Sequence, residues 1–122
     1  MIQEELLMKR RIMSFKHAFD GIFLVFKNEA NFRIEFSLGV LAVVLGFILN
    51  ISPIEWAIVL LLVAFVLSAE LLNSIIEKTV SCLSVDSVRH DTKDIAAGFV
   101  LILSIAAAII GLIIFLPKIL IS

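Results

Sequence analysis

Residues 56–77 read WAIVLLLVAFVLSAELLNSIIE, an apolar run that carries an acid, an amide and a second acid near its end. A carboxylate inside a membrane-spanning helix is costly, so it is a functional candidate by default. At about 100° per residue, Asn73 lies about 60° around a helix from Glu70, and Glu77 lies about 20° from it. The three side chains share one face, and the run therefore predicts a membrane helix with a polar stripe near one end.

The composition of the whole chain agrees with a membrane protein. Its 122 residues are 61% apolar and the mean hydropathy is +1.15, which is too hydrophobic for an ordinary soluble domain. Ten basic and eleven acidic side chains nearly cancel, so the net charge gives no sign of a nucleic-acid partner, and none is expected. Cys82 is the single cysteine, which excludes an intrachain disulfide framework. The length suits one domain, residues 1–122.

The hydrophobic runs predict three membrane spans in an all-α fold. Residues 36–54 and 95–116 are uncharged, and each run has about the 20 residues needed to cross roughly 30 Å of hydrocarbon. The run 56–76 completes the set, with Glu70 and Asn73 inside it. We accept these two polar residues within a span because this apolar segment would otherwise be exposed to water. Allowing for the helix ends, we expect spans at about 34–51, 54–80 and 92–118.

Residues 3–30 carry a helical pattern but are not hydrophobic enough to insert. Apolar side chains recur there at spacings of three and four, with charged residues between them; they are Met8, Ile12, Phe15, Phe19, Ile22, Phe23 and Phe26. This pattern is typical of an amphipathic helix that lies on a membrane surface. Glu29 follows at the far end of this helix, where the chain enters the first span.

Local capping signals predict how the spans are connected. The segment 52–55 reads SPIE, which is typical of a helix start with serine as N-cap, proline at the first position and glutamate at the third. The first two spans therefore form a hairpin. The polar segment 78–94 is the longer linker. We expect Asp91 or Thr92 to cap the third span, with Asp94 in its first turn.

Basic residues are concentrated on one side of the predicted spans. Those before the first span are Lys9, Arg10, Arg11, Lys16, Lys27 and Arg33, three more lie between the second and third spans, and only Lys118 follows the third. By the positive-inside rule, the N-terminus and the 78–94 linker of this multi-pass membrane protein face the cytoplasm. We expect no cleavable signal sequence, because the first apolar run starts only after a long charged segment.

Three carboxylates are expected to meet at the cytoplasmic level of the bilayer. Glu70 and Glu77 come from the second span, and Glu29 comes from the junction of the surface helix with the first span. Acidic groups gathered in a poorly solvated place repel one another unless a divalent cation joins them, and carboxylate oxygens suit Mg²⁺, which binds through one or two carboxylates plus substrate phosphates. Lys93 adds a cation for phosphate oxygens, and Glu70 is placed to take a proton from a hydroxyl. The combination predicts phosphoryl transfer to a lipid hydroxyl.

Each of these residues alone has a simpler interpretation. Asn73 suits an interhelical hydrogen bond, Glu77 suits a solvated interface, and Lys93 suits a positive flank. The alternative function is a non-catalytic transporter or assembly subunit in which Glu70 relays protons or ions. A relay would need polar groups through the whole bilayer, whereas the outer halves of all three spans are almost purely aliphatic. The chain has no Walker-type glycine-rich loop, which excludes a soluble-type nucleotide fold.

Several motifs resemble those of the small bacterial integral-membrane diacylglycerol kinase and undecaprenol kinase family. Residues 69–77 resemble its A-E-x-x-N-[ST]-[AI]-I-E signature, residues 93–98 resemble its K-D-x-A-[AS] element, and residues 28–35 resemble its N-E-x-x-[FM]-R motif. Residues 14–21 are similar to its aromatic-rich beginning. The likeness covers nearly the whole chain in the right order. One departure is Ser81, which stands where the family usually has aspartate, and which bears on nucleotide preference.

The resemblance implies a location in the bacterial plasma (inner) membrane, an assembly and a reaction. Family members are homotrimers of three-span protomers, with active sites shared between neighbouring subunits. A homo-oligomer is also expected because three thin helices enclose little interior, and the small residues of the third span let helices approach closely. The reaction implied is ATP- and Mg²⁺-dependent phosphorylation of diacylglycerol to phosphatidic acid. Undecaprenol remains the alternative substrate, because both lipids present a hydroxyl at the interface on an apolar tail.

The resemblance also implies roles for individual residues. Glu70 would be the base that activates the lipid hydroxyl, and Glu29 and Glu77 would bind Mg²⁺ on ATP. The nucleotide-binding residues implied are Arg10, His17, Asn73, Asp86, Lys93 and Asp94. The surface helix would line the path of the lipid, and the lipid-binding residues expected are Glu70, Phe19, Phe32 and Glu35.

Overall fold

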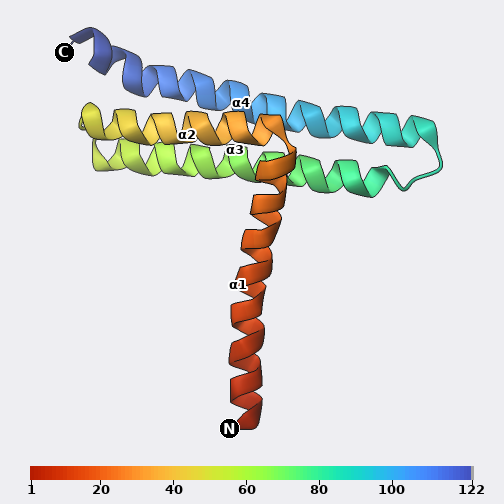
Figure 1. Cartoon of the computed structure of the whole chain (residues 1–122). Coiled ribbons are helices and arrows are strands. Elements are labelled where there is room, and N and C mark those ends of the chain that lie inside the picture. The colour runs from red at the N-terminus through yellow and green to blue at the C-terminus, as the bar shows by residue number, and fades with distance from the viewer. Residues whose placement is uncertain (122) are drawn as a thin grey trace.

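Four helices make up the fold of the computed structural model, which describes residues 1–121. They are α1 (Ile2–Asn28), α2 (Ala30–Ile48), α3 (Pro53–Val80) and α4 (Asp86–Ile121). In Figure 1, α2, α3 and α4 lie side by side as a bundle, and α1 leaves the bundle sideways from the start of α2. No strand occurs among the described residues. The prediction of an all-α fold is confirmed.

Three of these helices, α2, α3 and α4, are long and apolar enough to cross a membrane. They correspond to the three predicted spans, so that prediction is also confirmed. Only a small part of each hydrophobic stretch is buried inside the single chain. An apolar surface of this extent needs lipid or another protein to cover it.

The helix that contains the third span begins earlier than the expected cap at Asp91 or Thr92. α4 begins at Asp86 and not near residue 92, so the linker shrinks to residues 81–85. The Thr92 hydroxyl donates to the Val88 carbonyl at 2.7 Å, which places Thr92 inside the helix and not at its cap. Neither glycine nor proline interrupts residues 86–97, and the Arg89 guanidinium pairs with Asp86 one turn earlier. The expectation that Asp91 or Thr92 caps this helix is therefore wrong, because a polar sequence continues a helix beyond the hydrophobic span as readily as it ends one.

The turn between α2 and α3 forms as predicted. The Ser52 hydroxyl accepts a hydrogen bond from the Glu55 backbone N–H at 3.2 Å, and a Glu55 carboxylate oxygen accepts one from the Ser52 N–H at 2.9 Å. These reciprocal bonds are a capping box, with Pro53 at the start of the helix. Asn50 has φ 50°, a left-handed conformation that asparagine tolerates better than most residues.

Two glycines let α2 and α3 approach closely. A Cβ atom added at Gly46 would lie 2.7 Å from the Trp56 ring, and one added at Gly39 would lie 2.9 Å from a methyl group of Val63. Small residues at such positions are a common way to pack helices in lipid. The hairpin therefore depends on the absence of side chains at both positions.

The corner between α1 and α2 is built around one extended residue, Glu29, with φ −122° and ψ 117°. The Arg33 guanidinium reaches back across this break and donates to the carbonyls of Phe26 and Lys27 at 2.9 and 2.8 Å. These carbonyls belong to the last turn of α1, where helices leave acceptors without partners. Phe32 is 2% exposed and meets Phe26 edge-on. The corner is thus held by packing and by hydrogen bonds, and it directs α1 sideways.

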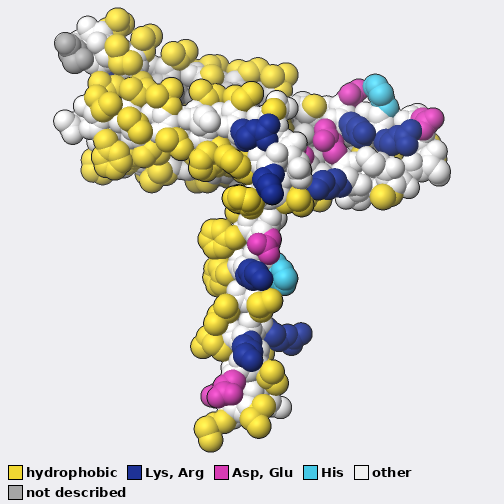
Figure 2. Space-filling model, in the orientation of Figure 1, with side chains coloured by type: hydrophobic (Ala, Val, Ile, Leu, Met, Phe, Trp, Pro, Cys, Tyr) yellow, Lys and Arg dark blue, Asp and Glu magenta, His cyan; other side chains and the backbone are white. Residues whose placement is uncertain are grey.

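The side chains of α1 are divided between two faces. Figure 2 shows apolar side chains along one side of the helix, and basic side chains and a histidine along the other. The apolar side faces the same way as the apolar body of the bundle, while charged side chains gather at the corner and at the opposite end of the bundle. This is the arrangement expected of an amphipathic helix at the boundary between lipid and water.

Candidate functional site

The polar stripe of α3 is joined to the α1–α2 corner by a direct hydrogen bond. The Ser74 hydroxyl donates to a carboxylate oxygen of Glu29 at 2.5 Å, and it also lies 3.0 Å from the backbone carbonyl of Glu70. Ser74 is 2% exposed. Its position one turn after Glu70 brings the Glu29 carboxylate, which starts the first span, onto the same stripe.

Glu70 is the buried centre of this region. It is 4% exposed, which is rare for a carboxylate. The negative charges of Glu35, Glu29 and Glu77 all lie near enough to repel an ionised Glu70. Acidic groups from α2, from the corner and from α3 therefore lie within electrostatic range of Glu70, and the expected meeting of Glu29, Glu70 and Glu77 around a cation stays a prediction. Glu35 takes part more directly than its sequence position alone had indicated.

Asn73 presents an oxygen that the described residues leave without a partner. Its Oδ1 atom is buried and has no hydrogen-bond partner within residues 1–121. A buried polar atom without a partner costs about 1–3 kcal/mol. Such an atom is suited to accept a hydrogen bond from a ligand or to contact a cation.

The described residues contain no group of three or more His, Cys, Asp or Glu side chains placed to hold a metal ion. A cage that binds a metal through protein atoms alone is therefore not formed by this part of the chain. Mg²⁺ can instead bind through one or two carboxylates together with phosphate oxygens. Glu29 and the exposed Glu77 fit that simpler requirement, with the Mg²⁺ arriving on a nucleotide.

The predicted nucleotide-binding residues of α4 all lie on its polar first half. Lys93 is partly exposed and makes no ion pair within residues 1–121. Asp94 is exposed and lies 3.2 Å from Nδ1 of His90, while Asp86 pairs with Arg89. Because α4 begins at Asp86, these groups are carried by a helix and not by a loop. Figure 2 shows the charged side chains gathered at this end of the bundle.

The predicted residues of α1 are not brought to Glu70 within one protomer. Arg10, His17 and Phe19 are exposed, and α1 extends away from the bundle (Figure 1). At 1.5 Å per residue, they lie roughly 28, 18 and 15 Å along the helix from Glu29. A second protomer would be needed to bring such residues to a shared site.

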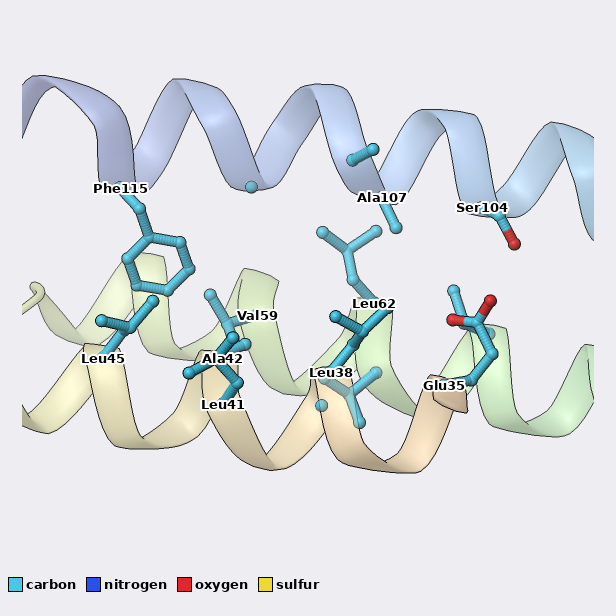
Figure 3. Close-up of a pocket in the computed structure, with 15 residues that line it drawn as sticks. Glu35, Leu38, Leu41, Ala42, Leu45, Val59, Leu62, Ser104, Ala107 and Phe115 are labelled. Carbon is cyan, nitrogen blue, oxygen red and sulfur yellow. The ribbon is translucent and has the colours of Figure 1, made fainter. Parts of the chain in front are cut away.

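The other two predicted lipid-binding residues have different surroundings. Phe32 is a core residue of the corner, and its ring is not accessible to a lipid in this protomer. Glu35 is half-buried and lines a cavity of about 410 Å³ between α2, α3 and α4, with Ser104 facing it from α4 (Figure 3). The structure thus separates a packing residue, Phe32, from Glu35, which faces the cavity.

Sequence reasoning missed three features of the site: the Ser74–Glu29 bond, the cap formed by Arg33 and the cavity. Ser74 follows Glu70 by four residues, so its place on the stripe could have been read from helical spacing. The contact of Arg33 depends on the break at Glu29, and the cavity depends on three packed helices. No local pattern in the sequence signals either of them.

Comparisons with known proteins cover most of the chain. The sequence profile of prokaryotic diacylglycerol kinase matches residues 16–115, which include the whole polar stripe and exclude Arg10. Undecaprenol kinase of Bacillus subtilis is 38% identical over 113 residues, which are 91% of this chain and 92% of that protein. Diacylglycerol kinase of Synechocystis sp. is 35% identical over 113 residues, which are 89% of this chain and 64% of that protein.

Proposed function

Because the chain belongs to the prokaryotic diacylglycerol kinase family, we propose that it transfers the γ-phosphate of ATP to the hydroxyl of a membrane lipid. The observation that carries this proposal is the Ser74–Glu29 hydrogen bond of 2.5 Å. It holds a carboxylate of the α1–α2 corner on the same stripe as the buried Glu70, so that a candidate base and a candidate metal ligand lie near each other.

The reaction assigns a separate task to each group. The lipid hydroxyl oxygen attacks the γ-phosphorus, the bond from that phosphorus to the bridging oxygen breaks, and ADP leaves. Glu70 accepts the hydroxyl proton, a role that its burial near the polar end of α3 supports. Lys93 pairs with phosphate oxygens. Asn73, with its unpartnered oxygen, and Asp94 contact the nucleotide.

Mg²⁺ is the cofactor we propose, and it would be held by Glu29 and Glu77 together with ATP. When bound, Mg²⁺ neutralises charge that develops on the transferred phosphoryl group. Glu29 is oriented for this task by Ser74, which holds one of its two oxygens and leaves the other available. Glu77 is exposed, so it can reach a ligand that arrives from water.

We further propose that the working form is a homotrimer with sites shared between protomers. Arg10 and His17 lie on α1, which extends away from its own bundle. Their side chains would contact a nucleotide that is bound at the site of a neighbouring subunit. The positive charges before α2 and near α4 favour a cytoplasmic N-terminus and a cytoplasmic site in the bacterial plasma membrane. Asp86 would contact the nucleotide at the rim of the site.

We place undecaprenol first as the lipid and diacylglycerol second, which reverses the order expected from sequence alone. The relative named undecaprenol kinase matches along 92% of its own length, whereas the relative named diacylglycerol kinase matches along 64% of its length. The family name and the second relative favour diacylglycerol. Both alcohols present the same chemistry to Glu70.

The test is a direct assay of the two lipids in parallel. Purified protein in lipid vesicles is given ATP labelled at the γ-phosphate, Mg²⁺ and either undecaprenol or dioleoylglycerol. Labelled undecaprenyl phosphate or phosphatidic acid supports the proposal and ranks the substrates. Label in neither lipid would favour the transporter or assembly subunit, although the cavity between α2, α3 and α4 is apolar beyond Glu35 and Ser104 and offers no polar path along its length.

A further inference from the structure

An ion pair joins α3 to α4 at the end of the bundle that is opposite the polar stripe. The Lys118 ammonium nitrogen lies 3.0 Å from each carboxylate oxygen of Glu55. We infer that this pair sets the position of α4 along α3, and that it thereby holds Lys93 and Asp94 where they contact the nucleotide. The inference rests on the kinase activity proposed above, and it makes Lys118 and Glu55 positioning residues that touch no substrate.

The Glu55 carboxylate is held from two sides. One of its oxygens also accepts the Ser52 backbone N–H at 2.9 Å, which fixes the acid to the start of α3. The Glu55 side chain is 23% exposed and that of Lys118 is 31% exposed, and the nearby Trp56 and Phe115 pack on the apolar core. Charges that are shielded from water attract each other more strongly than exposed ones. Lys118 also lies in the last turn of α4, where the helix dipole favours a cation.

The contact between α3 and α4 contains no second polar link. α4 packs mainly on α3 and touches α2 much less. Within residues 1–121, no other side-chain hydrogen bond or ion pair connects α3 with α4. Apolar side chains pack at more than one register, whereas a polar pair away from water is satisfied in one register only. The pair of Lys118 and Glu55 therefore supplies the directional contact that this interface otherwise lacks.

The linker between α3 and α4 does not fix this register. Residues 81–85 form neither helix nor strand, and five extended residues span roughly 17 Å. Neighbouring helices lie about 8–10 Å apart, so the linker has length to spare for a shift of one helical turn, about 5.4 Å. The axial position of α4 is therefore set at its far end, by Lys118.

The register decides where the first half of α4 meets the polar stripe. α4 is continuous from Asp86 to Ile121, so an axial shift at Lys118 is carried to Lys93, roughly 38 Å along the helix. Counted in equal steps from the ion pair along the two antiparallel helices, Glu77 comes level with about Ala96, which is 5% exposed. Lys93 then lies about one turn beyond Glu77. A slip by one turn would move Lys93 by about 5.4 Å, which exceeds the length of a hydrogen bond.

The first test measures the register without turnover. Nitroxide labels are attached at Leu60→Cys and Ile95→Cys, two exposed positions that lie roughly 27 Å apart along the bundle when counted from the ion pair. Cys82, which is free and exposed, is replaced by serine, and labelled protein is diluted with unlabelled protein in vesicles. We expect Lys118→Met to change the distance measured by electron–electron double resonance by about 5 Å, one helical turn, and Lys118→Arg to keep the wild-type distance. The control is Lys16→Met, which removes an exposed lysine of α1.

The second test connects the register with the nucleotide. In Lys118→Met, we expect at least about a tenfold rise in the KM for ATP and in the dissociation constant of trinitrophenyl-ATP with Mg²⁺, because small misplacements of binding groups are costly. The KM for lipid should change little, and Lys118→Arg should restore both values. The double variant of Glu55→Gln with Lys118→Met should be no worse than Lys118→Met, since both changes break one pair.

Three outcomes would overturn the proposal. They are an unchanged distance in Lys118→Met, a loss of kcat with unchanged nucleotide affinity, and a double variant whose loss is the sum of two separate losses. The second of these would indicate a purely structural role for the pair. If the wild type binds the nucleotide but phosphorylates no lipid, the kinase proposal fails, and the distance and the dissociation constant still decide whether Lys118 positions α4. If the wild type binds no nucleotide, both proposals fail.

Discussion

The Ser74 hydroxyl and the Glu29 carboxylate form a hydrogen bond of 2.5 Å across 45 positions of sequence. This bond ties the break between α1 and α2 to the polar stripe of α3. Since Glu29 is extended and belongs to neither helix, its side chain has few other restraints. The position of a proposed Mg²⁺ ligand therefore depends on one buried hydroxyl.

Replacing Ser74 by alanine should release the Glu29 side chain and weaken the binding of Mg²⁺. Hydrogen bonds to charged groups contribute about 1.5–3 kcal/mol, so we expect the concentration of Mg²⁺ required for half-maximal activity to rise about tenfold or more. The KM for lipid should change little. Ser68→Ala is the matched control, because Ser68 is an exposed serine on the same helix. An unchanged Mg²⁺ requirement in Ser74→Ala would contradict the positioning role of this serine.

Glu70→Gln and Glu77→Gln should fail in different ways. Glu70→Gln keeps the size of the side chain but removes the proton acceptor, so kcat should fall by about 10²–10⁴ at any Mg²⁺ concentration, while ATP binding persists. Glu77→Gln should regain part of its activity when Mg²⁺ is raised, because only a metal ligand is lost. Initial rates measured over a Mg²⁺ series separate the two outcomes. Normal turnover of Glu70→Gln would exclude Glu70 as the catalytic base.

Arg33→Ala should loosen the corner that carries α1. The substitution removes the bonds of 2.9 and 2.8 Å to the carbonyls of Phe26 and Lys27, and these carbonyls in the last turn of α1 then lose the donor that Arg33 supplies. We expect faster amide hydrogen exchange over residues 22–28, with exchange in α3 unchanged. Arg11→Ala, on the exposed part of α1, is the control. Identical exchange in the wild type and Arg33→Ala would show that packing at Phe32 alone holds the corner.

Gly46→Ala should destabilise the α2–α3 hairpin. Its Cβ atom would lie 2.7 Å from the Trp56 ring, and overpacking of this kind costs about 1–3 kcal/mol. Thermal unfolding in detergent measures the effect, which should be relieved in the double variant with Trp56→Leu. Gly21→Ala is the control, since a Cβ atom there meets nothing within 4 Å and alanine favours a helix. Equal destabilisation by both single variants would point to a general effect of the substitution.

Much of the architecture could be predicted because its causes are local. The length of the apolar runs predicted three spans, and the segment 52–55 predicted a capping box that the structure contains. The spacing of Glu70, Asn73 and Glu77 predicted a shared stripe. The start of α4 could not be predicted in the same way, since a polar stretch suits a linker and an exposed helix alike. The helix α4 begins as early as Asp86 because no glycine or proline interrupts residues 86–97.

The amino-acid sequence alone was enough to establish a helical membrane protein, its family resemblance and the residue types of its polar stripe, because hydrophobic length and helical period act between near neighbours in the chain. Packing in three dimensions was needed for the Ser74–Glu29 bond, for the Arg33 cap and for the cavity that begins at Glu35. Each of these joins segments that are separated by a break or a turn. Their contacts arise only when the corner at Glu29 and the close approach at Gly39 and Gly46 set the helices against one another.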